Sequence, residues 1–203
     1  MNRLLTAIAL TGIACPIALH PSAHPEPQGK RPPADPIQSR VIKTAAKERI
    51  LVQEAWFEAP IEAVWQAYTT SDGWTAWASP KAEIDLRVGG LVRTHYDKAA
   101  AIGDPGTNTL TIVNYVPHQL LTLRADLRAN WPEILKQDAD NLTNPILFEA
   151  IAPKLTRVMS YGVGYRDAPE YDKLLSMFSK ANETLLEALK VYLETGVRSE
   201  FDH

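Results

Sequence analysis

The C-terminal part of the chain carries one long amphipathic helix pattern, which limits the folds open to the rest. Residues 167–170, Asp-Ala-Pro-Glu, combine a capping residue, an early proline and a glutamate, as at many helix starts. An apolar stripe at steps of three and four residues then continues to Gly196, through Leu174, Phe178, Ala181, Leu185, Leu189 and Tyr192. Such a helix, about 28 residues or roughly 42 Å long, needs an apolar surface of similar length to cover.

Strand patterns precede this helix and predict the surface that it covers. Beta-forming residues, or an alternation of apolar and polar ones, mark segments 48–59, 82–88, 91–97, 109–116, 120–127, 146–151 and 155–164. Gly89 and Gly90 predict a tight two-residue hairpin between the second and third segments.

Two short helices are expected after the first strand. Pro60 suits a first helical turn, and Trp74 and Trp77 fall on a second short helix. The apolar face of the first helix consists of Ile61, Val64, Trp65 and Tyr68, which recur at helical spacing. The chain is therefore predicted to adopt an α+β fold, in which a curved antiparallel sheet wraps around the long C-terminal helix.

Length and composition indicate one folded domain, over residues 45–197. About 150 residues are left once the N-terminal segments are set aside, which is enough for a single core. The net charge is −3 and both signs are scattered, so no nucleic-acid partner is expected. The chain carries no nucleophile elbow, zinc-helix, phosphate-loop or dinucleotide pattern, so no cofactor and no metal are expected, and the absences favour a protein that is not an enzyme.

The N-terminus resembles a secretory signal. A positive start precedes an apolar run that is too short to span a bilayer, so residues 1–14 are predicted to be a signal peptide and the protein to be exported, to the periplasm. Cys15, the single cysteine, stands at the cleavage point. Ordinary cleavage after Ala14 or a little later would release a soluble protein, whereas a lipoprotein peptidase would leave Cys15 as an acylated N-terminus. This lipid anchor is the one membrane attachment that the sequence suggests. Residues 15–40 are rich in proline and are predicted to form a linker.

One segment of the chain resembles a known family. It contains the matching residues Pro60, Val64, Trp65, Trp77, Asp85, Leu86, Arg87, Val88, Gly89 and Gly90, and further matches lie in VNYVPHQLL, TRVMSYGVGY and LLEALKVYLETG. Together these residues, spread over about residues 47–196, resemble the helix-grip domains called SRPBCC or START-like, which include polyketide cyclase-like proteins. Within them the chain resembles the branch of homologues of the heat-shock protein ATPase activator. The resemblance implies an apolar cavity between the sheet and the long helix.

Candidate ligand-binding residues follow from the expected faces of the sheet and the helix. Their side chains would line the cavity with apolar or aromatic surface and a few polar groups. They are Trp77, Val92, Thr94, Tyr96, Ile112, Asn114, Leu123, Phe148, Tyr161, Leu174 and Phe178. The polar candidates among them are Thr94, Tyr96, Asn114 and Tyr161. No residue is assigned a catalytic role. Alternation around Leu123 directs Arg124 outward, whereas the resemblance would place an inward side chain near this position.

Residues 128–145 are longer than the family pattern requires at this place. Asn130, Pro132 and Glu133 predict a short capped helix, which would either close the cavity as a lid or complete the core as a fixed element. The favoured function is an exported binder of a small hydrophobic molecule. A cyclase- or lyase-like enzyme using the same cavity, and a chaperone-interacting module, are the alternatives.

Overall fold

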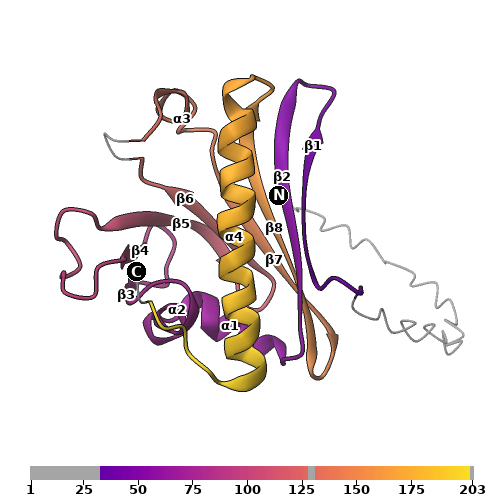
Figure 1. The fold of residues 1–203 in the computed structure, drawn as a ribbon, viewed down its shortest axis with the longest axis vertical. Helices are drawn as coiled ribbons and strands as arrows, with labels where there is room; N and C mark the ends of the chain where they lie inside the picture. Colours follow the sequence, from indigo (N-terminus) through magenta and orange to yellow (C-terminus); the bar gives the residue numbers. More distant parts are fainter. Residues whose placement is uncertain (1–32, 128–130, 202–203) are drawn as a thin grey trace, which may run out of the picture.

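The computed structural model describes residues 33–127 and 131–201 (Figure 1). The predicted signal peptide, Cys15 and most of the predicted linker lie outside these residues. In the described part the strands are β1 (Ile37–Lys43), β2 (Glu48–Phe57), β3 (Lys81–Ile84), β4 (Leu91–His95), β5 (Asn108–Val116), β6 (Leu120–Ala125), β7 (Asn144–Ala152) and β8 (Leu155–Arg166). The helices are α1 (Ile61–Thr69), α2 (Ser71–Trp77), α3 (Glu133–Gln137) and α4 (Glu170–Thr195).

The strands form one antiparallel sheet in the order β1-β2-β8-β7-β6-β5-β4-β3. Helix α4 crosses one face of this sheet, which we call the inner face (Figure 1). Helices α1 and α2 lie near the C-terminal end of α4, and α3 lies near its N-terminal end. This is the predicted α+β helix-grip arrangement.

Helix α4 begins and ends close to where its sequence pattern predicts. Gly196 follows its last turn with a φ of 76°, and the Gly196 amide donates to the carbonyl of Tyr192. Glycine suits this left-handed position because it has no Cβ. Leu175, Leu186 and Leu189 are buried against the sheet. Because burying each leucine contributes about 1.5–3 kcal/mol, these contacts hold the helix on the inner face.

Strand β1 is a correction to the sequence analysis. Residues 37–40 belong to this strand and not to the linker predicted over residues 15–40, so the two short helices follow β2, the second strand. The segment IQSRVIK is largely exposed and lacks a clear alternation. It is a strand because it pairs with β2 along its whole length, from Ile37 opposite Ala55 to Lys43 opposite Arg49.

The predicted two-residue hairpin at Gly89 and Gly90 is also wrong. Six residues, 85–90, connect β3 to β4, and they fold back onto β5. The Gly89 amide donates to the Ile112 carbonyl, and the Ile112 amide donates to the Gly90 carbonyl, both at 2.8 Å. A Cβ on Gly90 would lie 2.0 Å from the Asp85 carbonyl oxygen. Gly90 is therefore required by close backbone approach.

Within the described ranges, no helix is both long and apolar enough to cross a membrane. In the same ranges, no group of three or more histidine, cysteine or acidic side chains is placed to hold a metal ion.

Candidate ligand-binding site

The apolar interior consists of two clusters at opposite ends of α4. The larger cluster lies under α1 and α2 and includes Trp65, Tyr68 and Phe148, with the C-terminal half of α4 against it. The smaller cluster lies under α3 and joins Leu51, Leu135, Tyr171 and Leu175. Between the two clusters, part of the inner face of the sheet carries polar side chains.

Aromatic side chains pack against one another in the larger cluster. The Phe148 ring lies edge-on to both Trp65 and Tyr68, with ring centroids 5.2 Å apart in each case. The indole N–H of Trp77 donates to the Ala67 carbonyl at 3.0 Å, and that of Trp74 donates to the Tyr68 carbonyl at 2.7 Å. Edge-to-face packing of this kind stabilises a core beyond the area that it buries.

Gln53 separates the two clusters on the β2 side of α4. Its side chain is only 3% exposed. The Gln53 amide group donates to Ser39 Oγ and to the Ser179 carbonyl, and its carbonyl oxygen accepts from Asn182 Nδ2 at 2.7 Å. Burying a side-chain amide costs little folding free energy when each of its polar atoms makes a hydrogen bond, whereas burying one without hydrogen bonds is strongly destabilising. Gln53 therefore joins β1, β2 and α4 through a satisfied polar contact.

Asn144 and Ser160 form a second polar pair on the inner face. Asn144 Nδ2 donates to Ser160 Oγ at 2.9 Å and to the Tyr161 carbonyl at 3.0 Å. In the described part of the chain, the Ser160 hydroxyl hydrogen and the Asn144 carbonyl oxygen have no partner of their own. Both side chains are half-buried. The pair therefore offers one donor and one acceptor at an accessible place.

Apolar side chains lie beside this pair on the inner face of β5 and β6, and two of them, Leu110 and Ala125, are accessible at least in part. Register places Leu110 opposite Ala125, and Ile112 opposite Leu123, on the inner face of β5 and β6. Leu123 is buried, Leu110 is half-buried and Ala125 is exposed. An exposed alanine on the inner face means that α4 does not cover the sheet there. This accessible region around Leu110, Ala125, Asn144 and Ser160 is called the inner-face site below.

Helix α3 covers the smaller cluster next to the inner-face site. Leu135 is 2% exposed and packs in that cluster. The ring of Trp131, which precedes α3, lies 6.2 Å from that of Phe178 on α4. Gly164 has a φ of 93°, and a Cβ there would lie 2.1 Å from the Asn141 carbonyl oxygen. The segment after α3 is therefore pressed closely against β8.

Asp138, at the end of α3, anchors this segment. Its carboxylate accepts from Arg166 Nε at 2.8 and 2.9 Å and from the Tyr171 hydroxyl at 2.8 Å. Burial, with the bond to Asp138 next in importance, raises the pKa of Tyr171 above its usual value. The carboxylate raises the pKa of Arg166 as well, so both partners keep their protons at neutral pH.

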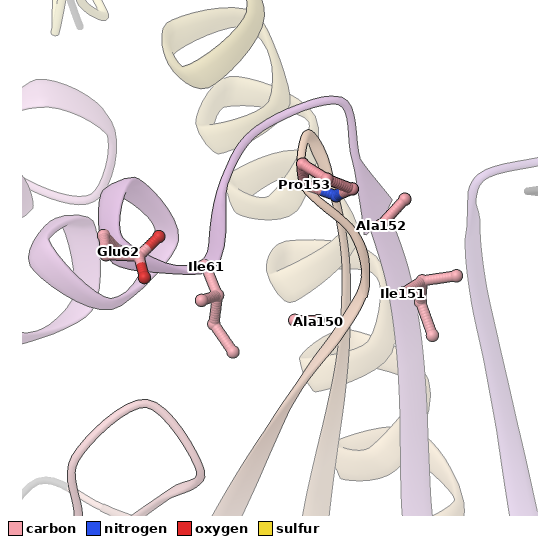
Figure 2. A pocket seen from close by; sticks show the side chains of 6 residues that line it. All are labelled: Ile61, Glu62, Ala150, Ile151, Ala152 and Pro153. Atoms are coloured by element: carbon pink, nitrogen blue, oxygen red, sulfur yellow. The ribbon is translucent and has the colours of Figure 1, made fainter. Parts of the chain in front are cut away.

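Two cavities of the described structure lie away from the inner-face site. One of about 220 Å³ lies between the start of α1 and the β7–β8 turn, lined by Ile61, Glu62 and residues 150–153 (Figure 2). It is small and mostly open, which suits a ligand poorly. The other, of about 670 Å³, is a groove between β1 and α4.

The structure brings most of the predicted site residues to the inner side. Trp77, Val92, Ile112, Leu123 and Phe148 are buried in the larger cluster. Thr94 is 5% exposed and lies on the same face as Val92. Leu174 and Phe178 are partly buried beside the smaller cluster.

Three predicted polar residues lie elsewhere. Asn114 is exposed and faces outward, because a bulge between Ile112 and Asn114 adds one residue to β5 and reverses the alternation. Tyr161 pairs with Val52 and faces outward, since the inner positions of β8 are those of Val158 and Ser160. Tyr96 follows β4 and is 53% exposed. Arg124 is exposed, as its alternation predicts.

Sequence patterns did not mark Asn144, Ser160 and Gln53, and they placed Ala125 on an apolar face without marking it as a site residue. Ser160 lies two places from Val158 in an alternating strand, so its inward direction could have been inferred. Asn144 stands before the predicted strand 146–151, and only the longer β7 brings it opposite Leu123. No local pattern marks Gln53, whose partner Asn182 is 129 residues away.

Comparisons with known proteins agree with this fold. A model of the family described as Activator of Hsp90 ATPase homolog 1-like protein matches residues 58–194. A search of curated proteins found no relative of the chain.

Several solved structures are similar to the chain at low sequence identity. The Aha1 dimer from Colwellia psychrerythraea has a TM-score of 0.57 and 17% identity, over 72% of this chain and 97% of that one. CalU16 from Micromonospora echinospora has a TM-score of 0.56 and 16% identity, over 79% and 85%. A conserved protein of unknown function from Enterococcus faecalis has a TM-score of 0.55 and 17% identity, over 81% and 84%. Likeness at this level shows a shared fold.

Proposed function

Because the chain belongs to the family of Activator of Hsp90 ATPase homolog 1-like proteins, within the helix-grip superfamily, we propose that it holds a small hydrophobic molecule at the inner-face site. This superfamily is known for binding hydrophobic ligands in this fold. The observation that carries the proposal is the accessible apolar surface around Leu110 and Ala125, with the Asn144–Ser160 pair beside it. The apolar surface would supply affinity, and the pair would orient one polar group of the ligand.

Binding fits the inner-face site better than acid–base catalysis does. In the described part of the chain, the inward positions of β4 to β8 carry no histidine and no carboxylate, as their register shows. General acid–base catalysis uses such groups at a suitable pKa. A cyclase-like activity would therefore rest on confinement of the ligand and on the neutral groups of Asn144 and Ser160.

The proposed place of action is outside the cytoplasm. It rests on the charged start and apolar run of residues 1–14, with Cys15 as the point of cleavage or acylation. N-terminal sequencing of the protein from fractionated cells tests this part. A chain that starts at Met1 in the cytoplasm would disprove export, and it would also restore the chaperone-interacting alternative.

The binding part can be tested by filling the site. Thr94→Trp would overpack a buried position. Ala125→Trp places a large ring on the inner face without displacing core side chains, and Arg124→Trp is its matched control because Arg124 is exposed and outward-facing.

The probe is an anilinonaphthalene dye whose fluorescence rises in apolar surroundings. We expect the wild type and Arg124→Trp to bind it alike, and Ala125→Trp to bind it at least about tenfold more weakly. All three proteins should melt at similar temperatures. Equal binding by a folded Ala125→Trp protein would place the apolar site elsewhere.

A further inference from the structure

The groove between β1 and α4 lies on the opposite flank of the helix from the inner-face site. Ser39, Val41 and Lys43 line it from the inner face of β1, and Arg49 and Leu175 contribute to it. Along α4 it extends from Asp172 to Glu183, which corresponds to roughly 16 Å of helix. The stretch of β1 from residue 39 to 43 spans about 13 Å. The groove is thus long and narrow, with the length of a short extended peptide.

Strand β1 offers open backbone groups beside this groove. It is an edge strand of the described sheet. The Pro36 carbonyl accepts from the Trp56 amide and the Thr44 amide donates to the Glu48 carbonyl, so even-numbered residues direct their backbone groups toward β2. Direction alternates along an antiparallel ladder. The N–H and C=O groups of Ser39, Val41 and Lys43 therefore point away from the sheet.

The charges around the groove favour an acidic occupant. Lys43 and Arg49 are paired with Asp167, and Arg49 also with Asp172. Arg40 and Lys180 line the groove and have no carboxylate within ion-pair distance among the described residues. The carboxylate of Glu183 accepts a hydrogen bond from Ser179 Oγ at 3.2 Å. Two positively charged side chains without an ion-pair partner in the described part of the chain, Arg40 and Lys180, therefore line the groove together with one carboxylate, that of Glu183.

A second copy of the chain fits this edge less well. Antiparallel pairing of β1 with the same strand of another molecule, centred on this stretch, would bring the two Arg40 side chains close together, and like charges across strands are unfavourable. Exposed Val41 and Ile42, at 45% and 41%, would still gain burial from any added strand.

We propose that β1 and this groove bind an extended acidic segment of another protein as an added strand. Its backbone would pair with Ser39, Val41 and Lys43, as in other cases where a peptide extends a sheet. Alternate side chains would enter the groove, where carboxylates would meet Lys180. This surface is separate from the inner-face site, and neither proposal depends on the other.

Val41→Pro tests the backbone pairing. Proline removes an N–H that points away from β2, so the β1–β2 ladder keeps its hydrogen bonds while the open edge loses a donor. Val41→Thr is the matched control, because it keeps the N–H and the branched side chain. Lys180→Glu, on the exposed flank of α4, tests the charge without touching the sheet.

The probe is a fluorescein-labelled acidic nonapeptide in which valine alternates with glutamate. The control is a basic nonapeptide, labelled in the same way, in which valine alternates with lysine. By fluorescence anisotropy we expect the acidic peptide to bind the wild type and Val41→Thr within about threefold of each other, and Val41→Pro and Lys180→Glu at least about tenfold more weakly. Hydrogen exchange of the Ser39, Val41 and Lys43 amides should slow on binding.

Three results would overturn the proposal. They are equal binding of the basic peptide, unchanged affinity of folded Val41→Pro, and self-association of the wild type through β1 in sedimentation. Ala125→Trp should leave peptide binding unchanged, so failure at the inner-face site and failure at this edge are distinguishable.

Discussion

Removal of the Asp138 anchor should loosen α3 without unfolding the domain. Asp138 is 6% exposed, and its carboxylate accepts hydrogen bonds from Arg166 and from Tyr171. Asp138→Asn keeps the side-chain volume but removes the charge. Tyr171 keeps a second acceptor in the Ile134 carbonyl at 3.3 Å, and Arg166 is 54% exposed, so water can solvate it.

These contacts set the size of the effect. Hydrogen bonds to a charged group contribute about 1.5–3 kcal/mol, against about 0.5–1.5 kcal/mol for neutral ones. Because Arg166 is half exposed, we expect a loss near the lower end, about 2 kcal/mol in the free energy of opening the α3 segment. This loss corresponds to roughly 30-fold faster amide exchange if exchange proceeds by local opening.

Hydrogen exchange followed by mass spectrometry measures the effect on peptides from residues 131–142. Asp140→Asn is the control, because Asp140 is exposed two residues further on. Exchange of α3 in Asp138→Asn at the wild-type rate would refute the anchoring role. Equal acceleration across the whole sheet would show instead that α3 opens only with the domain.

The same variant tests α3 as a lid. If α3 gates the inner-face site, the dye should leave Asp138→Asn faster by a similar factor in stopped-flow measurements. Faster amide exchange with an unchanged dye release rate would make α3 a fixed cover of the smaller cluster.

Three further predictions concern stability. Arg49 and, next, Lys43 hold the pKa of Asp167 below its usual value. The contribution of the Asp167 carboxylate to the stability of the fold is therefore complete above about pH 4 and is lost as the pH falls further. Asp167→Asn should lower the melting temperature at pH 7 but not at pH 2. Burial raises the pKa of Tyr165 to about 12. The contribution of the neutral phenol to the stability of the fold is therefore complete below about pH 10 and is lost as the pH rises. Tyr165→Phe should lessen the fall in melting temperature between about pH 9 and about pH 11.5. Gly90→Ala should destabilise the domain by about 1–3 kcal/mol in urea unfolding, because the new Cβ meets the Asp85 carbonyl.

Each of these has its own check. Equal losses for Asp167→Asn at both pH values would contradict the ion-pair explanation. An unchanged alkaline profile in Tyr165→Phe would remove burial of this phenol as a cause. Gly89→Asn is the control for Gly90→Ala, since Gly89 has a φ of 75°, which asparagine tolerates, and open space around it. Similar destabilisation by both changes would argue against close backbone approach at Gly90.

Local sequence patterns by themselves predicted most of the elements and the layer arrangement. The stripe from Leu174 to Tyr192 and the glycine at position 196 predicted α4, because helix periodicity and capping depend only on neighbouring residues. Alternation placed the strands from β2 to β8 and directed Leu123 inward and Arg124 outward. The aromatic residues of the family pattern likewise marked the larger cluster, in which they are buried.

Only the tertiary structure decided where the sheet ends and which polar groups face inward. Strand β1 exists through its pairing with β2, and the bulge before Asn114 exists through the register of β5 on β6. Gln53 is buried because Asn182, Ser39 and Ser179 satisfy it from α4 and β1. Such partners lie far away in the sequence, so the free energy that fixes these positions comes from long-range pairing and not from local periodicity.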